Sequence, residues 1–366
     1  MLIPLIRPLM PNVSLLTEYL EAPYASGVWS NFGPLHNRAC DIIREMTGRF
    51  PVLTSSATSA LNLILSEFDE NYIAIPDFTH SGTFFGSSLH LPDWKSAEKV
   101  YLMSCDPKTK TPSTKALDDY ERCHDFWGNE NIMVIVNPFG YGVNRKRYLD
   151  FLSNANLSRA IVFDYAGAWG DFDIDDKDDC PTVFSFHATK SLPIGEGGMA
   201  LFSTIEEAEN FRAKTNFNTY KDRRIYTANT GTGNMKLSEL SCAMLCAQLD
   251  PRQYPRILSR IENRRELLRY YQAELKVEVN PEKPAYPSLC VVDWPLENAI
   301  GIETYASSQG FIAKQYYMPL HKMPAFSCQP TLGDVDTPSA LDHCLALPSD
   351  VTMEEARHVV DRLKAF

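Results

Sequence analysis

The chain has 366 residues, enough for one large and one smaller domain, each with its own hydrophobic core. Hydrophobic residues make up 44% of the chain and charged residues 22%, as in an ordinary globular protein. The formal net charge of −11 argues against a nucleic acid or an anionic membrane as partner, because either would require a basic face. This charge still allows a local basic pocket for a phosphorylated small molecule.

The N-terminal stretch MLIPLIRPLMPNVSLL is apolar, but it contains three prolines and Arg7 and lacks the features of a signal peptide. No run of about 18 uncharged apolar residues occurs, so we expect no membrane-spanning helix. The 9 cysteines include no CxxC pattern, which suggests neither a zinc ribbon nor a disulfide framework. We interpret Cys242 and Cys246 as small buried residues on one helix face. Reduced thiols predict a cytoplasmic location.

From Pro51 to Thr204, short apolar runs alternate with helical stretches. Several runs are apolar throughout, as expected for strands that are covered on both faces. A helix is predicted over Thr58–Phe68, because its apolar residues recur at i, i+3, i+4 and i+7. Strands are predicted at 52–54, 72–76, 100–103, 132–137, 160–164, 182–186 and 199–203. This alternation predicts an α/β fold with a large domain built on a mainly parallel sheet.

After Leu237 the pattern changes. Two helices are predicted, over LSELSCAMLCAQL and YPRILSRIENRRELLRYYQAEL. An apolar run at 289–296 and a helix near Ala299–Gln309 fit a smaller α+β domain. We therefore predict a large domain over 1–250 and a small C-terminal domain over 251–366.

The segment VLTSSATSALNLIL predicts a strand, a turn of small residues and the start of a helix. Free backbone N–H groups at a helix N-terminus, together with the hydroxyls of Ser56, Thr58 and Ser59, can bind a phosphate. Ordinary capping of the helix by Ser or Thr is the alternative interpretation.

Asp164 ends the apolar run AIVFD, at the edge where open α/β sheets bind ligands. A carboxylate there needs a partner, because an unpaired buried charge is costly. The partner could also be a loop N–H group or a helix cap.

Ser185, His187 and Lys190 follow the next apolar run, and GEGG lets the chain turn and return as a strand. Most lysines lie in solvent, but this turn holds Lys190 near the edge of the sheet. The patterns GxGxxG and GxxxxGK[ST] are absent, which disfavours a dinucleotide oxidoreductase.

A phosphate site, a strand-end aspartate and a sheet-edge lysine occur in this order, and together they are what pyridoxal phosphate (PLP) requires. The aspartate pairs with the protonated ring nitrogen and keeps the ring an electron sink. The lysine forms the Schiff base, and its free amine can later move a proton. Such a lysine must be partly desolvated so that its amine is available near neutral pH.

The sequence resembles the DegT-type sugar aminotransferases, which are fold-type-I (aspartate aminotransferase-like) PLP enzymes. The resemblance extends over most of the chain and depends on the order and spacing of TSSATSALNL, PDFTHS, VNPFGYG, FDYAGAWG, SFHATKSLPIGEGGM and GNMKLSELSCAMLCAQL. It implies that Lys190 forms the Schiff base and that Asp164 contacts the pyridine nitrogen. The cofactor phosphate would be held by Ala57, Thr58, Ser59 and Ser185.

The resemblance also implies roles for residues outside this set. His80 stands where the family usually has an aromatic residue stacked on the cofactor ring. Asn234 and Lys236 match a segment that reaches the phosphate of the neighbouring subunit's site, which implies a homodimer with shared active sites. His187 and His321 are the implied substrate-binding residues.

Three departures from the family pattern are present. Gly167 stands where the family commonly has Gln or His at the cofactor's ring hydroxyl, and SSAT replaces the commoner SGT. Lys236 replaces the usual Arg, which keeps the charge but loses the bidentate fork.

These features predict a PLP-dependent aminotransferase that transfers an amino group, expected from glutamate, to a nucleotide-linked keto sugar for amino-sugar or surface-polysaccharide biosynthesis. A PLP-dependent sugar dehydratase of the same fold is one alternative, although such relatives replace the lysine. A non-catalytic sugar-nucleotide-binding scaffold is another, although it would need neither Lys190 nor Asp164. A ketone that is not a sugar remains an alternative substrate.

Overall fold

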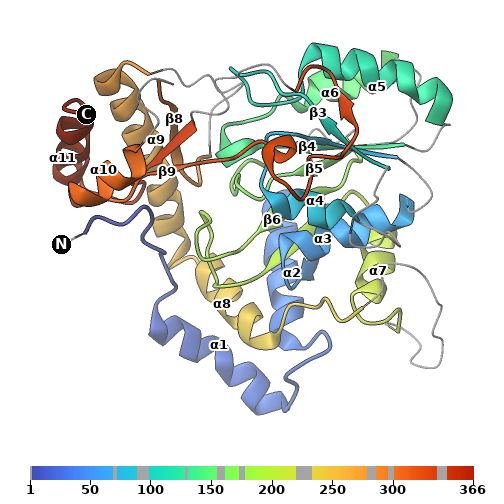
Figure 1. Ribbon diagram of the computed structural model, residues 1–366. Coiled ribbons are helices and arrows are strands. Elements are labelled where there is room, and N and C mark those ends of the chain that lie inside the picture. The colour runs from blue at the N-terminus through green and yellow to red at the C-terminus, as the bar shows by residue number, and fades with distance from the viewer. Residues whose placement is uncertain are drawn as a thin grey trace.

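The computed structural model describes residues 2–68, 72–88, 99–127, 131–154, 161–172, 178–219, 233–277, 286–295, 301–335 and 344–366. Figure 1 shows a large unit built around a sheet and a smaller unit beside it that contains the C-terminal helices. Parts of three sequence-predicted elements, Ala160, Leu296 and residues 299–300, lie outside the described residues.

The large sheet has eight strands in the order β1-β7-β6-β5-β4-β2-β3-β10. Strand β7 runs antiparallel to both β1 and β6, and the other neighbouring pairs are parallel. The strands are β1 Phe50–Thr54, β2 Ile73–Pro76, β3 Val100–Met103, β4 Ile132–Val136, β5 Ile161–Asp164, β6 Thr182–Ser185, β7 Gly198–Phe202 and β10 Thr331–Leu332. The predicted mainly parallel sheet is confirmed, and each of its seven predicted strands is present within one or two residues.

Helices cover both faces of this sheet, and strand β4 shows the consequence. Ile132, Val134 and Val136 point to one hydrophobic core, and Met133 and Ile135 point to the other. A strand buried on both faces has no polar side, which explains the continuous apolar runs of the sequence. The core on one face includes helices α3 Ala57–Leu65, α4 Ser81–Ser88 and α7 Ile205–Lys214. The core on the other includes α2 Pro34–Thr47, α5 Thr114–Trp127, α6 Arg145–Asn154 and α8 Glu239–Leu249.

The smaller unit has its own antiparallel sheet, in the order β8-β11-β9, packed against α9, α10 and α11. Its elements are α9 Tyr254–Leu275, β8 Cys290–Asp293, α10 Ile302–Ser308, β9 Lys314–Gln315, β11 Cys344–Leu347 and α11 Met353–Leu363. Helix α1, Val13–Ser26, packs against α8 and α2 at the bottom of the view in Figure 1. Within the described ranges, no helix combines the length and the apolar character that crossing a membrane requires.

Two segments make contacts across the boundary between the large and small units. The N-terminal Ile3 bridges to Phe311, and both termini lie beside the small unit (Figure 1). In the other direction, β10 pairs with β3, and Leu320 and Phe326 join the core of the large unit. The division into domains at residue 250 stays a prediction.

Candidate active site

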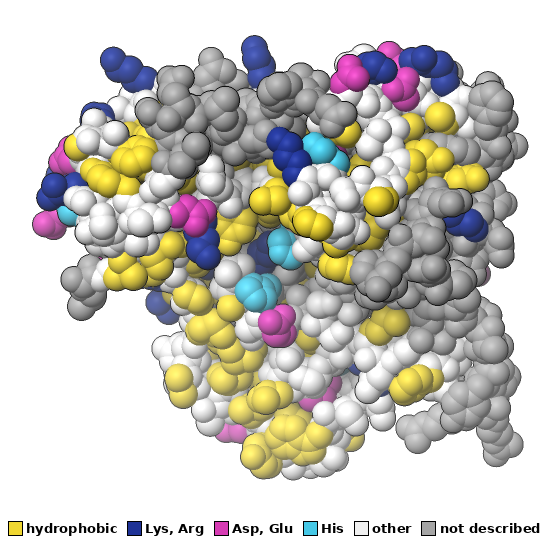
Figure 2. Space-filling model, in the orientation of Figure 1, with side chains coloured by type: hydrophobic (Ala, Val, Ile, Leu, Met, Phe, Trp, Pro, Cys, Tyr) yellow, Lys and Arg dark blue, Asp and Glu magenta, His cyan; other side chains and the backbone are white. Residues whose placement is uncertain are grey.

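A cavity of about 340 Å³ lies where β4, β5 and β6 end and helix α3 begins. Its volume is within the range of small-molecule sites. Figure 2 shows this side of the molecule hollowed near its centre, with histidine, cationic and acidic side chains beside the hollow. The cavity brings together seven of the sequence-predicted site residues, namely Ala57, Thr58, His80, Asp164, Ser185, His187 and Lys190.

The start of helix α3 forms one end of the cavity. Ser56 caps the helix by accepting a hydrogen bond from the Ser59 amide at 3.0 Å. The amides of Ala57 and Thr58 have no acceptor within a helix of this geometry, and both residues line the cavity. Gly198 of the adjacent strand allows this approach, because a Cβ there would be 2.3 Å from the Ala57 nitrogen. The result is a set of phosphate-binding donors at a positive helix end, which we call the α3 cup.

Asp164 lies at the carboxyl end of β5 and is buried, with 4% of its surface exposed. Its Oδ2 accepts a hydrogen bond from Thr83 Oγ1 at 2.9 Å, and its Oδ1 accepts one from the Ala166 amide at 3.0 Å. Thr79 Oγ1 contacts Thr83 Oγ1 at 2.9 Å, and because Thr83 donates to Asp164, Thr79 is the donor in this contact. Burial raises the pKa of Asp164, and the hydrogen bonds from Ala166 and Thr83 oppose that shift. Thr83 and Ala166 therefore fix the orientation of the carboxylate, which faces the cavity.

Lys190 lies on the loop between β6 and β7. Its backbone amide donates to the His187 carbonyl at 2.9 Å, and Gly195, at φ 102°, lets the chain turn back toward β7. Burial lowers the pKa of Lys190, the charge of Asp164 opposes this, and the charge of Arg264 adds to it. An amine with a lowered pKa is neutral, and so nucleophilic, in a larger fraction of molecules.

An aromatic wall covers the side of the cavity next to the small unit. Tyr317 stacks on Phe139 with ring centroids 4.7 Å apart and an interplanar angle of 18°. It also meets His80 edge-on, with centroids 6.0 Å apart. The Gly82 amide donates to His80 Nδ1 at 3.0 Å, so the proton of a neutral His80 is on Nε2. His80, Phe139 and Tyr317 thus form an aromatic side to the same space that Asp164 and Lys190 face.

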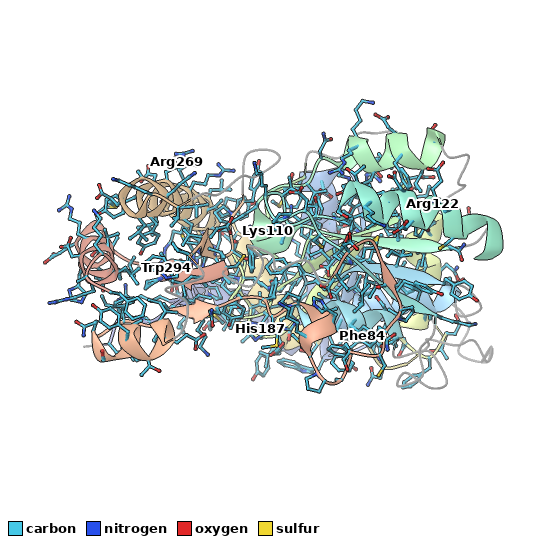
Figure 3. All side chains as sticks on the ribbon, turned by 45° about the horizontal axis from the view of Figure 1, so that its top comes forward. Phe84, Lys110, Arg122, His187, Arg269 and Trp294 are labelled. Atoms are coloured by element: carbon cyan, nitrogen blue, oxygen red, sulfur yellow. The ribbon has the colours of Figure 1, made fainter. Side chains whose placement is uncertain are left out.

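His187 and Glu196 lie where the cavity opens. Figure 3 shows His187 at the junction of the two units. The Thr189 amide donates to His187 Nδ1 at 3.3 Å, and His187 Nε2 lies 3.6 Å from Glu196 Oε1. Because Nδ1 is the acceptor, Nε2 carries the proton and faces the carboxylate. Glu196 is the exposed member of this pair.

Three of the sequence-predicted phosphate residues, Ser59, Asn234 and Lys236, do not line the cavity. Ser59 hydrogen bonds to Ser56, and its hydroxyl lies 2.9 Å from the Ser56 hydroxyl. Lys236 Nζ donates to Asn216 Oδ1 at 2.8 Å and to Asn234 Oδ1 at 2.5 Å. The backbone of Lys236 bridges to Thr54 beside the α3 cup, but its side chain bonds to Asn216 and Asn234 and does not line this chain's own cavity.

His321 also lies outside the cavity lining. Its Nδ1 is 2.7 Å from Asp77 Oδ2, and its amide donates to Asp77 Oδ1 at 2.9 Å. Asp77 is buried at the end of β2, so it needs these donors. The contact fixes the segment that carries Tyr317 over the sheet. The sequence-predicted substrate contact of His321 stays a prediction.

The structure gives a physical reason for Gly167. A Cβ at this position would lie 3.1 Å from the Gly140 nitrogen and 3.2 Å from both the Phe139 carbonyl carbon and Ser288 Oγ. A side chain at 167 would therefore be in tight contact with the backbone of 139–140, which would have to shift to accept it. The cavity wall at this point is backbone rather than a glutamine or histidine.

Several lining residues were not found from the sequence. Asn137 follows the end of β4, which is the same strand-end signal that identified Asp164. Thr83 and Ala166 donate hydrogen bonds to Asp164, but no sequence pattern marks either residue as part of a site. Tyr317 gave no local signal, because its place in the wall depends on how a distant segment crosses the sheet.

These residues fit PLP. A phosphate needs N–H and O–H donors, and the α3 amides with the Ser185 hydroxyl supply them. The Ser185 oxygen accepts from the His187 amide at 3.3 Å, which leaves its own proton to donate. A pyridine nitrogen needs a fixed carboxylate and an aldehyde needs an available amine, which Asp164 and Lys190 supply. The fold and the site define the class of fold-type-I, PLP-dependent aminotransferases.

A family model described as the DegT/DnrJ/EryC1/StrS aminotransferase family matches residues 155–364. The chain belongs to this family.

Two curated relatives are similar over most of the chain. Protein Rv3402c of Mycobacterium tuberculosis is 28% identical over 289 residues, which is 74% of this chain and 64% of that protein. This chain thus spans just under two thirds of the mycobacterial relative's length. A dTDP-4-amino-4,6-dideoxy-D-glucose transaminase of Shigella dysenteriae is 22% identical over 98% of this chain and 97% of its own.

Solved structures with low sequence identity show the same fold. A Bacillus cereus protein superposes over 100% of both chains with a TM-score of 0.85 and 20% identity. The sugar aminotransferase CalS13 from Micromonospora echinospora covers 99% of both chains with a TM-score of 0.80 and 19% identity.

Proposed function

We propose that the protein is a PLP-dependent aminotransferase that transfers an amino group from glutamate to a nucleotide-linked keto sugar in the cytoplasm. The observation that carries this proposal is the single cavity that Lys190, Asp164 and the α3 cup share. The Shigella relative, which is named as a transaminase of a dTDP-linked sugar, supports the substrate class.

PLP supplies an electron sink that stabilises negative charge at the carbon next to a substrate amine. Residues of the chain would bind the cofactor and control its protonation. The amides of Ala57 and Thr58 and the Ser185 hydroxyl bind the phosphate. Asp164, oriented by Thr83 and Ala166, keeps a proton on the ring nitrogen by its negative charge.

Lys190 has two tasks in this proposal. Its Nζ would hold the cofactor, and while an amino donor is bound the free amine of Lys190 would take the proton from the donor's α-carbon. Burial supports the second task, because it lowers the pKa of Lys190 and makes the neutral amine more available as a base. The aromatic wall of His80, Phe139 and Tyr317 excludes water from this side of the site.

The proposed enzyme is a homodimer with shared active sites. Lys236 and Asn234 support this proposal, because the Lys236 backbone lies beside the cup while its side chain bonds to Asn234 and Asn216 and does not line this chain's cavity. A cation in that position can reach the phosphate site of a second copy.

An absorption spectrum of the purified protein with added PLP, before and after excess glutamate, tests the proposal. We expect a band from PLP bound to Lys190 and its loss when glutamate is added. Lys190→Ala should remove the band and reduce turnover at least about 10³-fold, whereas the exposed Lys146→Ala should change neither. A Lys190→Ala protein that still transaminated through many turnovers would refute the mechanism.

The keto substrate is tested separately with the PLP-loaded enzyme. A panel of nucleotide-linked keto sugars, free keto sugars and simple 2-keto acids is offered after the glutamate step, and the amine product is measured. The proposal predicts that the nucleotide-linked sugars react and that the free sugars do not. Turnover of a simple keto acid alone would contradict the proposed substrate class.

A further inference from the structure

A buried ion cluster lies behind the Lys190 loop, outside the cavity. Both Arg260 and Arg264 of helix α9 bind the carboxylate of Asp350 through two hydrogen bonds each, at 2.7–2.9 Å. Arg264 is completely buried, and 7% of the Arg260 side chain is exposed. Bidentate guanidinium–carboxylate pairs of this kind have a strongly fixed geometry.

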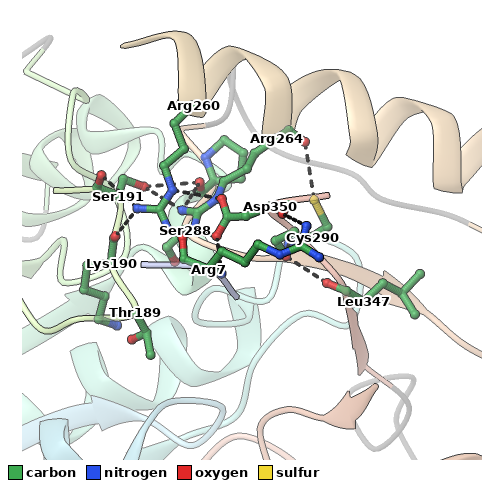
Figure 4. A network of polar contacts seen from close by, with 12 residues as sticks. Arg7, Thr189, Lys190, Ser191, Arg260, Arg264, Ser288, Cys290, Leu347 and Asp350 are labelled. Atoms are coloured by element: carbon green, nitrogen blue, oxygen red, sulfur yellow. Dashed lines mark hydrogen bonds and ion pairs between the residues drawn. The ribbon is translucent and has the colours of Figure 1, made fainter. Parts of the chain in front are cut away.

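The remaining guanidinium donors reach the loop that carries Lys190, as Figure 4 shows. Arg260 Nη1 donates to the Lys190 carbonyl at 3.0 Å and to the Ser191 carbonyl at 3.4 Å. Arg264 Nη1 donates to Ser191 Oγ at 3.3 Å. Three acceptors on two consecutive loop residues are therefore bound to one helix of the small unit.

The same cluster binds the N-terminal segment. The Arg7 amide donates to Asp350 Oδ2 at 3.0 Å, and Arg260 Nη2 donates to the Arg7 carbonyl at 3.0 Å. Ile6, next to Arg7, lines the cavity. The N-terminal segment at Arg7, helix α9 and the segment that carries Asp350 thus meet in this cluster.

We propose that Arg260 and Arg264 are positioning residues for Lys190, which hold the loop backbone so that the amine enters the cavity from one fixed point. Neither arginine lines the cavity, so they act only through Lys190 and Ser191. The inference deepens the proposed function and rests on it for the role of Lys190 as the reactive amine. A buried ion pair is often no more stabilising than apolar residues of the same size, so fixed geometry is the better explanation for this cluster.

The charges around Lys190 make this role measurable. Asp164 and His80 face Lys190 across the cavity, His187 lies on the same loop, and Arg264 lies behind it. Arg264 is the positive charge that adds to the effect of burial on the Lys190 amine. Removing the charge of Arg264 should therefore change the pKa of Lys190. Removing only its hydrogen-bond geometry should displace the loop and leave that pKa unchanged.

Hydrogen–deuterium exchange of the full-length, cofactor-free protein tests the positioning directly. In Arg264→Lys, which keeps the charge but not the fork, we expect exchange in peptides covering 186–194 to accelerate about tenfold or more, because the bond to Ser191 is lost and the paired bonds to Asp350 are weakened. Ser191→Ala removes the acceptor of Arg264 together with the hydrogen bond from the Ser191 hydroxyl to the Pro287 carbonyl. It should give a smaller change in the same peptides, because both arginines keep their bonds to Asp350 and Arg260 keeps its contacts with the loop carbonyls. Because Ser191→Ala is a mild substitution, it decides the question even if the arginine variants fold poorly.

Arg145→Lys is the matched control. Arg145 also forms a buried pair, with Asp178 at 2.6 Å, but it contacts neither Lys190 nor Ser191. This variant should exchange at the wild-type rate in 186–194. Equal acceleration in the control and in Arg264→Lys, or no acceleration in Arg264→Lys and Ser191→Ala, would overturn the proposal.

A second readout follows the rate at which added PLP attaches to Lys190 as a function of pH. We expect Arg264→Lys to attach PLP about tenfold or more slowly with an unchanged pH midpoint, because displacement of a reacting group costs rate. Arg264→Gln should also move the midpoint to higher pH. An unchanged rate in both variants would contradict the proposal. If the wild-type protein did not bind PLP, the proposed function would fail, while the exchange measurement would still decide whether the arginines hold the loop.

Discussion

Gly198 of β7 and Ala57 of helix α3 are in backbone contact. A Cβ on Gly198 would be 2.3 Å from the Ala57 nitrogen and 2.4 Å from the Ser56 carbonyl carbon, and neither of these is a flexible side-chain atom. The last glycine of GEGG therefore sets the position of the amides that form the phosphate cup.

Gly198→Ala should displace the cup. We expect its affinity for PLP to fall at least about tenfold, because hydrogen bonds to a charged group are worth roughly 1.5–3 kcal/mol each. Fluorescence titration with PLP measures this. Gly48→Ala is the control, since Gly48 has φ 68° and open space around it, so this change costs about 1 kcal/mol of stability without touching the cup. Equal PLP affinity in both variants would argue against the role of Gly198.

Sharing of active sites between subunits can be tested by complementation. Lys190→Ala and Lys236→Ala are each expected to be nearly inactive. When the two variants are mixed and allowed to exchange subunits, about a quarter of the sites should contain both native lysines and regain activity. A mixture as inactive as its separate components would show that Lys236 serves its own chain's site.

His187 and His321 should respond differently to the same substitution. His187→Ala alters the cavity mouth and should raise KM for the keto substrate about tenfold, equivalent to one lost polar contact, with little loss of stability. His321→Ala leaves buried Asp77 without its imidazole partner and should lower the free energy of unfolding by about 1–3 kcal/mol. Steady-state kinetics and urea unfolding of both variants separate the two effects. A KM change in His321→Ala without loss of stability would instead support direct substrate contact.

Asp350 should make the protein sensitive to acid. Burial raises its pKa, but the hydrogen bonds and charges of Arg260 and Arg264 outweigh that effect and lower the pKa to about 2. A lowered pKa contributes stability above the unfolded-state value near 3.8, and this contribution is lost as the pH falls toward 2. The stability difference between wild type and Asp350→Asn should therefore be about 3–5 kcal/mol at pH 7 and shrink by about 2 kcal/mol between pH 5 and pH 2.

Urea unfolding of both proteins in cofactor-free form at several pH values measures this difference. Arg145→Lys again serves as the control, because its buried pair does not include Asp350. A difference between wild type and Asp350→Asn that stayed constant from pH 5 to pH 2 would contradict the assignment.

The large sheet and the order of its functional residues could be predicted from the sequence. A strand buried on both faces is apolar along its whole length, as β4 is, and this signal is local. Asp164 and Lys190 follow such runs, and the carboxyl ends of parallel strands lie at one edge of the sheet. Their meeting in one cavity therefore follows from the chain order once the sheet is parallel.

Contacts between distant segments could not be predicted in this way. The imidazole of His321 bonds to Asp77, because a buried carboxylate just after β2 needs a donor, and nothing local in the sequence indicates this contact. The substrate contact expected for His321 stays a prediction. Tyr317 belongs to the aromatic wall because its segment passes over the sheet and places its ring on Phe139.

The sequence by itself determined the α/β class, the position of Asp164 at a strand end and of Lys190 shortly after the next strand, and a helix that starts near Thr58, because each depends on residues that are close along the chain. The tertiary structure decided which residues hold them: Gly198 beneath Ala57, Thr83 behind Asp164, and Arg260 behind Lys190. The physical reason is that these supporting contacts depend on how helices and strands pack, and packing joins residues whose separation in the sequence carries no local pattern.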